Sequence, residues 1–129
     1  MSNMSIEGFD KSQTMLAGEF LTLGHLLKRG YQASVTFGNA KSVDILAYNP
    51  RTDWSFAVQV KALRRPNCFP IKKEGVSANH IYVFVILNEG SRPEQFHIVK
   101  GEHLLSDVNH SGVAHTQTTK LCPRSITVR

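Results

Sequence analysis

Polar side chains interrupt two successive apolar segments of this chain. Asp44 lies within one segment, and Gln59 and Lys61 lie within the next. Because side chains two positions apart on a strand share a face, we expect Gln59 and Lys61 to project together. If the two segments pair as a hairpin, Asp44 falls opposite Val58 or Gln59, beside the other two polar side chains.

This set of side chains can bind a metal and act on a phosphate. Carboxylate and amide oxygens are ligands that Mg²⁺ accepts, with waters in the remaining octahedral positions. A lysine beside such a metal can stabilise charge that develops on a phosphate or help to deprotonate the attacking water. Glu19 would add a carboxylate if a helix carrying it packs over the strand ends. These residue types predict metal-assisted phosphodiester hydrolysis.

A helix over residues 12–29 is the element that would position Glu19. Ser12 is a suitable N-cap, and Gly30 is a suitable terminator. The apolar side chains follow the helical period and predict an amphipathic helix that covers the sheet; they are Met15, Leu16, Phe20, Leu23, Leu26 and Leu27.

Apolar and alternating patterns define the rest of the architecture. They predict strands over 31–37, 42–48, 54–61, 81–87 and 94–99 and a short helix over 101–108. Turns are expected at Gly38–Asn39 and over 49–53, a surface loop over 64–79, and a polar tail over 109–129. The order predicts an α/β fold with a central sheet, in a single domain over 1–129 with its core over about 12–108.

Asp44 followed by Gln59-Val60-Lys61 resembles the motif of the PD-(D/E)xK nuclease superfamily, in its Gln-x-Lys variant. The segment from Ala17 to Tyr31, with Glu19 and a glycine-aromatic end, is similar to the first helix of the Holliday-junction-resolvase-like and Mrr-type branches. The resemblance covers residues 14–100.

The resemblance implies a restriction-endonuclease-like α-β-β-β core, a central mixed sheet flanked by helices, and a metal-dependent DNA endonuclease that uses Mg²⁺, with Mn²⁺ as a substitute. Asp44, Gln59 and Glu19 would hold the metal, and Lys61 would be the catalytic lysine. The implied partners are double-stranded or branched DNA and a second copy in a homodimer. The sequence departs from the family pattern at Gln59, which replaces a carboxylate, and in the lack of a predicted helix over 64–79.

The overall charge is compatible with an anionic partner, since 15 Lys and Arg residues outnumber 10 Asp and Glu residues for a net charge of +5. The candidate phosphate contacts are Lys28, Arg29, Arg64, Arg65, Lys72 and Lys73. The longest apolar run, 81–87, is too short to span a membrane. Two cysteines, Cys68 and Cys122, predict no disulfide framework and a reducing, cytoplasmic setting. The composition excludes disordered, collagenous and coiled-coil chains.

Two other interpretations remain open. The domain could be a catalytically weak or inactive nuclease-fold module that binds DNA or assembles with partners. It could also be an α/β protein in which Asp44 and Lys61 form a structural salt bridge. The six histidines lack the spacing of zinc ligands.

Overall fold

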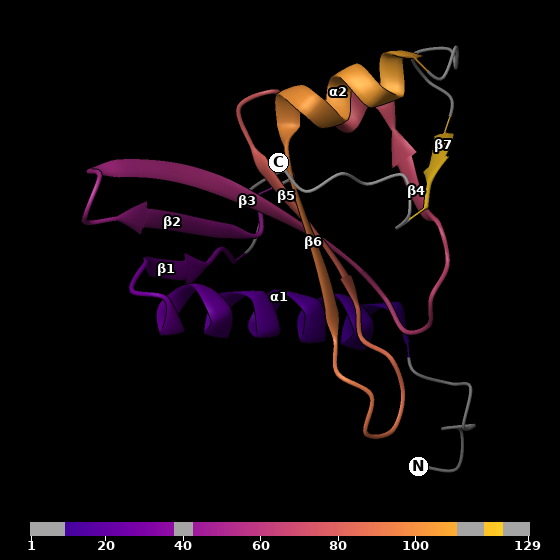
Figure 1. Ribbon diagram of the computed structural model, residues 1–129, viewed down its shortest axis with the longest axis horizontal. Helices are drawn as coiled ribbons and strands as arrows, with labels where there is room; N and C mark the ends of the chain where they lie inside the picture. Colours follow the sequence, from indigo (N-terminus) through magenta and orange to yellow (C-terminus); the bar gives the residue numbers. More distant parts are fainter. Residues whose placement is uncertain (1–9, 38–42, 111–117, 123–129) are drawn as a thin grey trace.

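The computed structural model describes residues 10–37, 43–110 and 118–122. It is an α/β fold with a five-stranded mixed sheet in the order β1-β2-β3-β5-β6 and a two-stranded sheet of β4 and β7 (Figure 1), which confirms the predicted class. The elements are α1 (Lys11–Lys28), β1 (Gln32–Val35), β2 (Ile45–Asn49), β3 (Trp54–Leu63), β4 (Phe69–Lys72), the 3₁₀ helix η1 (Lys73–Gly75), β5 (Ile81–Ile86), β6 (Gln95–Lys100), α2 (Gly101–His110) and β7 (Thr118–Leu121).

Helix α1 is capped at both ends. Asp10, and not Ser12 as predicted, is the N-cap: it forms a capping box in which the Gln13 amide donates to the Asp10 side chain at 2.8 Å. The predicted terminator is confirmed, because Gly30 has a φ of +90° and the Tyr31 amide donates to the Leu26 carbonyl. This left-handed ending turns the chain directly into β1.

The face that α1 turns to the sheet differs from the prediction. Gly18 and Thr22 are buried against the sheet, whereas Leu16, Phe20 and Leu27 are each about half exposed. A Cβ at residue 18 would lie 2.7 Å from the Ala62 Cβ, so only glycine permits this close approach of helix and strand. The apolar period marked the helix correctly and its buried side in part, because Met15, Leu23 and Leu26 do pack against the core.

The meander of β1, β2 and β3 is antiparallel, as predicted. Strand β5 pairs with β3 in parallel, and β6 closes the sheet on the other edge. The predicted turn at Gly38–Asn39 lies outside the described residues.

The crossover between β3 and β5 is more ordered than the predicted loop. It contains β4 and η1, and β4 pairs with β7 from the segment predicted as an unpatterned tail. Cys68 and Cys122 form a disulfide at one end of this ribbon, which corrects the expectation drawn from the cysteine count. A cytoplasmic location stays a prediction, and a disulfide counts against a reducing setting.

The sheet has an apolar core on each face. On the α1 side the core contains Ile45, Val58 and Val60. On the other side Phe84 of β5 packs with Leu104 of α2 and with the β4–β7 ribbon. Figure 1 shows α1 and α2 on opposite sides of the sheet. Strand β5 therefore lies between two cores, which explains its continuous apolar sequence. Neither described helix combines the length and the apolar character that crossing a bilayer requires.

Candidate functional site

Asp44 lies where β2 separates from β3. Its amide donates to the Val58 carbonyl at 2.9 Å, and its Oδ2 accepts a hydrogen bond from the Val60 amide at 2.7 Å. Ile45 is opposite Val58, so Asp44 falls opposite Gln59, within the predicted range. The carboxylate thus takes the place of a strand carbonyl and is fixed at the edge of β3.

Glu19 extends from α1 to the same point. Partial burial raises the pKa of Glu19, and the neighbouring negative charge of Asp44, together with a hydrogen bond between the two carboxyl groups, raises it further. Two carboxyl groups that meet in this way resist simultaneous ionisation unless a cation lies between them. The structure therefore brings together the two acids that the sequence analysis named.

The Gln59 side chain is held by a buried polar network. Gln59 is only 4% exposed; its Nε2 lies 2.8 Å from His80 Nδ1 and donates to the Tyr82 hydroxyl at 3.0 Å. The Tyr82 hydroxyl also accepts from the Ser77 amide at 2.7 Å. Because Nε2 is engaged by these two groups, Oε1 is the atom of the amide that could face a ligand. Sequence reasoning missed His80 and Tyr82; the hydroxyl of Tyr82 within an aliphatic strand was the available signal.

Lys61 lines two adjoining cavities, of about 380 Å³ and about 340 Å³. Gln59 lines the second of them, which confirms that Gln59 and Lys61 share a face. Within the described ranges, no hydrogen bond or ion pair engages the Lys61 ammonium, and the ion pairs do not include Asp44 with Lys61. The structural salt bridge is therefore wrong as an account of these residues.

The predicted phosphate contacts divide into two groups. Arg64 lines the first cavity and donates to Thr14 Oγ1 at 3.2 Å, and Lys72 lines the second. Lys11, which the sequence analysis did not name, joins Arg64 at the first cavity. No acidic residue among those described lines either cavity, so both are electropositive.

The other predicted contacts lie away from these cavities. Arg65 pairs with Glu89 at 2.8 Å, and Lys73 lies in η1 and lines neither cavity. Lys28 and Arg29 lie at the far end of α1, about 14 Å along the helix from Glu19. The structure thus does not gather these four residues around Lys61.

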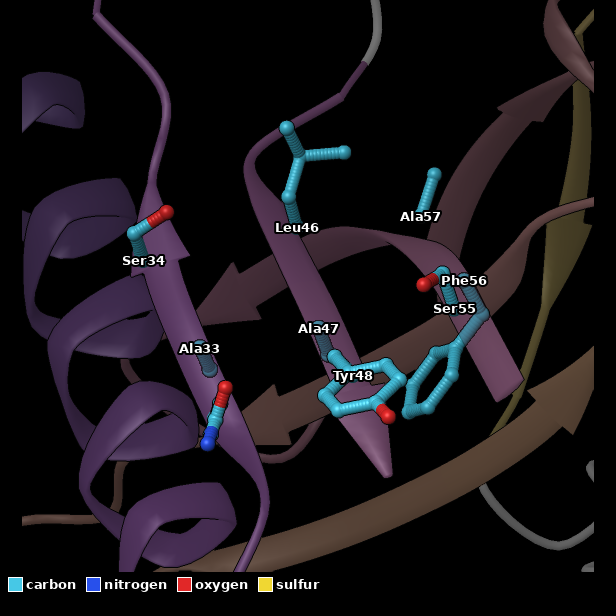
Figure 2. A pocket seen from close by; sticks show the side chains of 9 residues that line it. Ala33, Ser34, Leu46, Ala47, Tyr48, Ser55, Phe56 and Ala57 are labelled. Atoms are coloured by element: carbon cyan, nitrogen blue, oxygen red, sulfur yellow. The ribbon is translucent and has the colours of Figure 1, made fainter. Parts of the chain in front are cut away.

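A larger hollow, of about 670 Å³, lies on the outer face of β1, β2 and β3. Figure 2 shows Ser34, Leu46, Tyr48 and Ala57 on the strands that form it. Its lining carries no charged side chain. Ala57 lies two positions before Gln59 on β3 and therefore on the same face, so this hollow continues the face that carries Gln59 and Lys61. The cationic side chains Lys11, Lys61, Arg64 and Lys72 line the two smaller cavities instead.

Glu19 and Asp44 carry carboxyl oxygens and Gln59 an amide oxygen, which are the donor types that a hard cation accepts. Among the described residues, no three His, Cys, Asp or Glu side chains gather as a metal site; the set here consists of two acids and one amide. No family model, curated protein or solved structure matches this chain.

Proposed function

We propose that this protein is a Mg²⁺-dependent DNA endonuclease with a restriction-endonuclease-like fold. The observation that carries the proposal is the meeting of the Glu19 and Asp44 carboxyl groups at the edge of β3, the strand that also carries Gln59 and Lys61. Phosphodiester hydrolysis assisted by a metal requires this combination of acids and a cation.

The element order supports the proposed fold. Helix α1 precedes the β1-β2-β3 meander and a later buried strand, β5, follows, which is the order that the resemblance implies. Strand β5 pairs in parallel with β3. The expected helix between β3 and β5 is replaced by β4 and η1. The residues of the motif all lie on α1, at the start of β2 or on β3, so the substituted crossover leaves them in place.

The donor set fits a divalent cation. Burial is the largest cause of the raised pKa of Glu19, and the negative charge of Asp44 adds to it. A cation between the two carboxyl groups would offset their mutual repulsion. The fixed orientation of the Gln59 amide leaves its oxygen as a third ligand. When bound, Mg²⁺ or Mn²⁺ would polarise the scissile phosphate and favour ionisation of a water molecule.

The remaining roles belong to cationic side chains. Lys61, whose ammonium no described side chain neutralises, would stabilise the negative charge that develops on the phosphate. Lys11, Arg64 and Lys72 would contact neighbouring phosphates from the two cavities. Phosphate contacts position DNA without reading its sequence, so the proposed substrate is double-stranded or branched DNA, cleaved by a homodimer.

Cleavage of supercoiled plasmid and branched DNA tests the proposal. Wild-type protein is incubated with Mg²⁺, Mn²⁺ or EDTA beside Asp44→Asn, Lys61→Met and the control Asp53→Asn, which removes a carboxylate from an exposed turn. We expect metal-dependent cleavage by wild type and Asp53→Asn and a loss of about 100-fold or more in both site variants. Cleavage by Asp44→Asn at the wild-type rate would refute the assignment.

A second candidate function is a DNA-binding module without activity. The neutral Gln59, whose amide nitrogen is already engaged by His80 and Tyr82, favours it, because an amide oxygen is a weaker ligand than a carboxylate. DNA binding by folded wild-type protein, with no cleavage in any metal, would support this module over the enzyme.

A further inference from the structure

The hydroxyl group of Tyr82 is bonded to two backbone groups whose roles are fixed. The Ser77 amide can only donate, and it donates to the Tyr82 oxygen at 2.7 Å. The Gly75 carbonyl can only accept, and the Tyr82 hydroxyl donates to it at 3.3 Å. Both groups belong to the crossover between β3 and β5, where Gly75 ends η1. The crossover therefore commits the single hydroxyl hydrogen of Tyr82.

This commitment decides which atom of the Gln59 amide can face Tyr82. With its hydrogen directed to Gly75, the Tyr82 oxygen can only accept from a further partner. The Gln59 amide must then present Nε2, which lies 3.0 Å from the Tyr82 oxygen. The reverse orientation would place Oε1 against an oxygen that has no hydrogen to offer. Because Gln59 is only 4% exposed, water cannot readily replace the missing bond.

His80 adapts to the orientation that Tyr82 sets. Its Nδ1 lies 2.8 Å from Gln59 Nε2, and an imidazole nitrogen accepts or donates according to the tautomer. Because the amide nitrogen of Gln59 can only donate, Nδ1 of His80 accepts, and the neutral ring carries its hydrogen on Nε2. A change of tautomer would let His80 face Oε1 equally well, whereas Tyr82 would have to give up its bond to Gly75.

We infer that Tyr82 is a positioning residue: through it, the crossover backbone at Gly75 and Ser77 orients the Gln59 amide so that Oε1 is left free for a ligand. Within the described ranges, hydrogen bonds engage the Gln59 side chain through Nε2 alone. Gln59 also lines the cavity of about 340 Å³ beside Lys61. An amide has one oxygen where a carboxylate has two, so an amide ligand depends on such a constraint.

The parallel pairing of β3 with β5 supports this role. Gln59 and Tyr82 are register partners on the two strands, so the sheet itself holds the amide beside the phenol. The inference rests on the proposed function only where it treats Gln59 as a metal ligand. The orientation of the amide depends on hydrogen bonds within the protein and can be measured without metal.

The tautomer of His80 in the metal-free protein tests the orientation. Long-range proton–nitrogen NMR spectra, recorded in alkaline solution where imidazole is neutral, distinguish a ring hydrogen on Nε2 from one on Nδ1. We expect the hydrogen of His80 on Nε2. A hydrogen on Nδ1 would mean that Oε1 of Gln59 faces His80, and the inference would then be wrong.

Metal binding tests the positioning role. Calorimetric titration with Mn²⁺ compares wild type, Tyr82→Phe and the matched control Tyr48→Phe, which removes a phenolic hydroxyl that donates to Asp53. We expect about tenfold weaker binding by Tyr82→Phe, a loss typical of removing the partner that orients a metal ligand. Tyr48→Phe should bind as wild type does. Circular dichroism confirms that both variants are folded.

A carboxylate at position 59 separates positioning from a general effect on the fold. The Gln59→Glu side chain has two equivalent oxygens, so its metal affinity should not depend on the orientation that Tyr82 imposes. We expect Tyr82→Phe to weaken binding about tenfold in the wild-type background and less than about twofold in Gln59→Glu. Equal losses in both backgrounds, or no loss in either, would overturn the positioning role. No metal binding by wild type, with the His80 hydrogen on Nε2, would overturn the proposed metal site and uphold the orientation.

Discussion

Replacing glycine by alanine should have opposite effects on the stability of the protein at two positions of α1, Gly18 and Gly24. A Cβ at Gly18 would lie 2.7 Å from the Ala62 Cβ and 3.4 Å from Val60 Cγ1, whereas a Cβ at Gly24 would meet no atom within 4 Å. Replacement by alanine gains about 0.5–1 kcal/mol of helix stability at an unconstrained position. At Gly18 the added methyl must also force α1 away from β3, and overpacking of this kind costs about 1–3 kcal/mol.

The two variants therefore differ by the overpacking cost, because the gain in helix propensity is common to both. We expect Gly24→Ala to raise the free energy of unfolding by about 0.5–1 kcal/mol. The free energy of unfolding of Gly24→Ala should exceed that of Gly18→Ala by about 1–3 kcal/mol. Urea denaturation followed by circular dichroism, at concentrations where the chain is monomeric, measures both values.

A second-site change makes the test specific. Gly18→Ala combined with Ala62→Gly removes the clashing methyl from β3 and should recover part of the stability lost in Gly18→Ala. If Gly18→Ala were as stable as Gly24→Ala, the reasoning about how α1 packs on the sheet would be refuted. The approach of Glu19 to Asp44 would then lose its basis as well.

Three further results are expected. The pKa of Glu19 is raised, so the metal-free protein should lose stability as pH rises through the titration of this group; Glu19→Gln should lack that loss, and equal pH profiles in urea denaturation would contradict the prediction. Tyr82→Phe should lower the free energy of unfolding by about 1–3 kcal/mol because it leaves the partly buried Ser77 amide without its acceptor; an unchanged denaturation midpoint would count against the network. Replacing Cys68 and Cys122 by serine should cost about 4 kcal/mol, since the disulfide closes a loop over 54 positions; a wild-type midpoint that a reducing agent does not move would argue against the disulfide.

Local patterns predicted the elements that position the candidate site. The apolar segments of β2, β3 and β5 and the glycine terminator at Gly30 all depend on nearby residues, and the hairpin between β2 and β3 followed from its short turn. The predicted partner of Asp44, Val58 or Gln59, therefore included the observed one, Gln59. The pairing of Gln59 with Lys61 on one face needed only the two-residue period of a strand.

Other features depend on contacts between distant residues and could not be read locally. The apolar period of α1 did not reveal that Gly18 would pack on Ala62, so the predicted buried face included side chains that point outward. Strand β4 acquires a partner only through β7, about 50 residues later. His80 and Tyr82 reach Gln59 across the parallel pairing of β3 with β5, which the sequence pattern did not specify.

The proposed function depends most directly on the binding of one divalent cation by Glu19, Asp44 and Gln59. Calorimetric titration of wild-type protein with Mg²⁺ or Mn²⁺ measures it, beside Asp44→Asn, Glu19→Gln and the control Asp53→Asn. We predict one site per chain in wild type and Asp53→Asn, with affinity lowered about tenfold or more in the two site variants. No binding by folded wild-type protein, or equal binding by Asp44→Asn, would contradict the account.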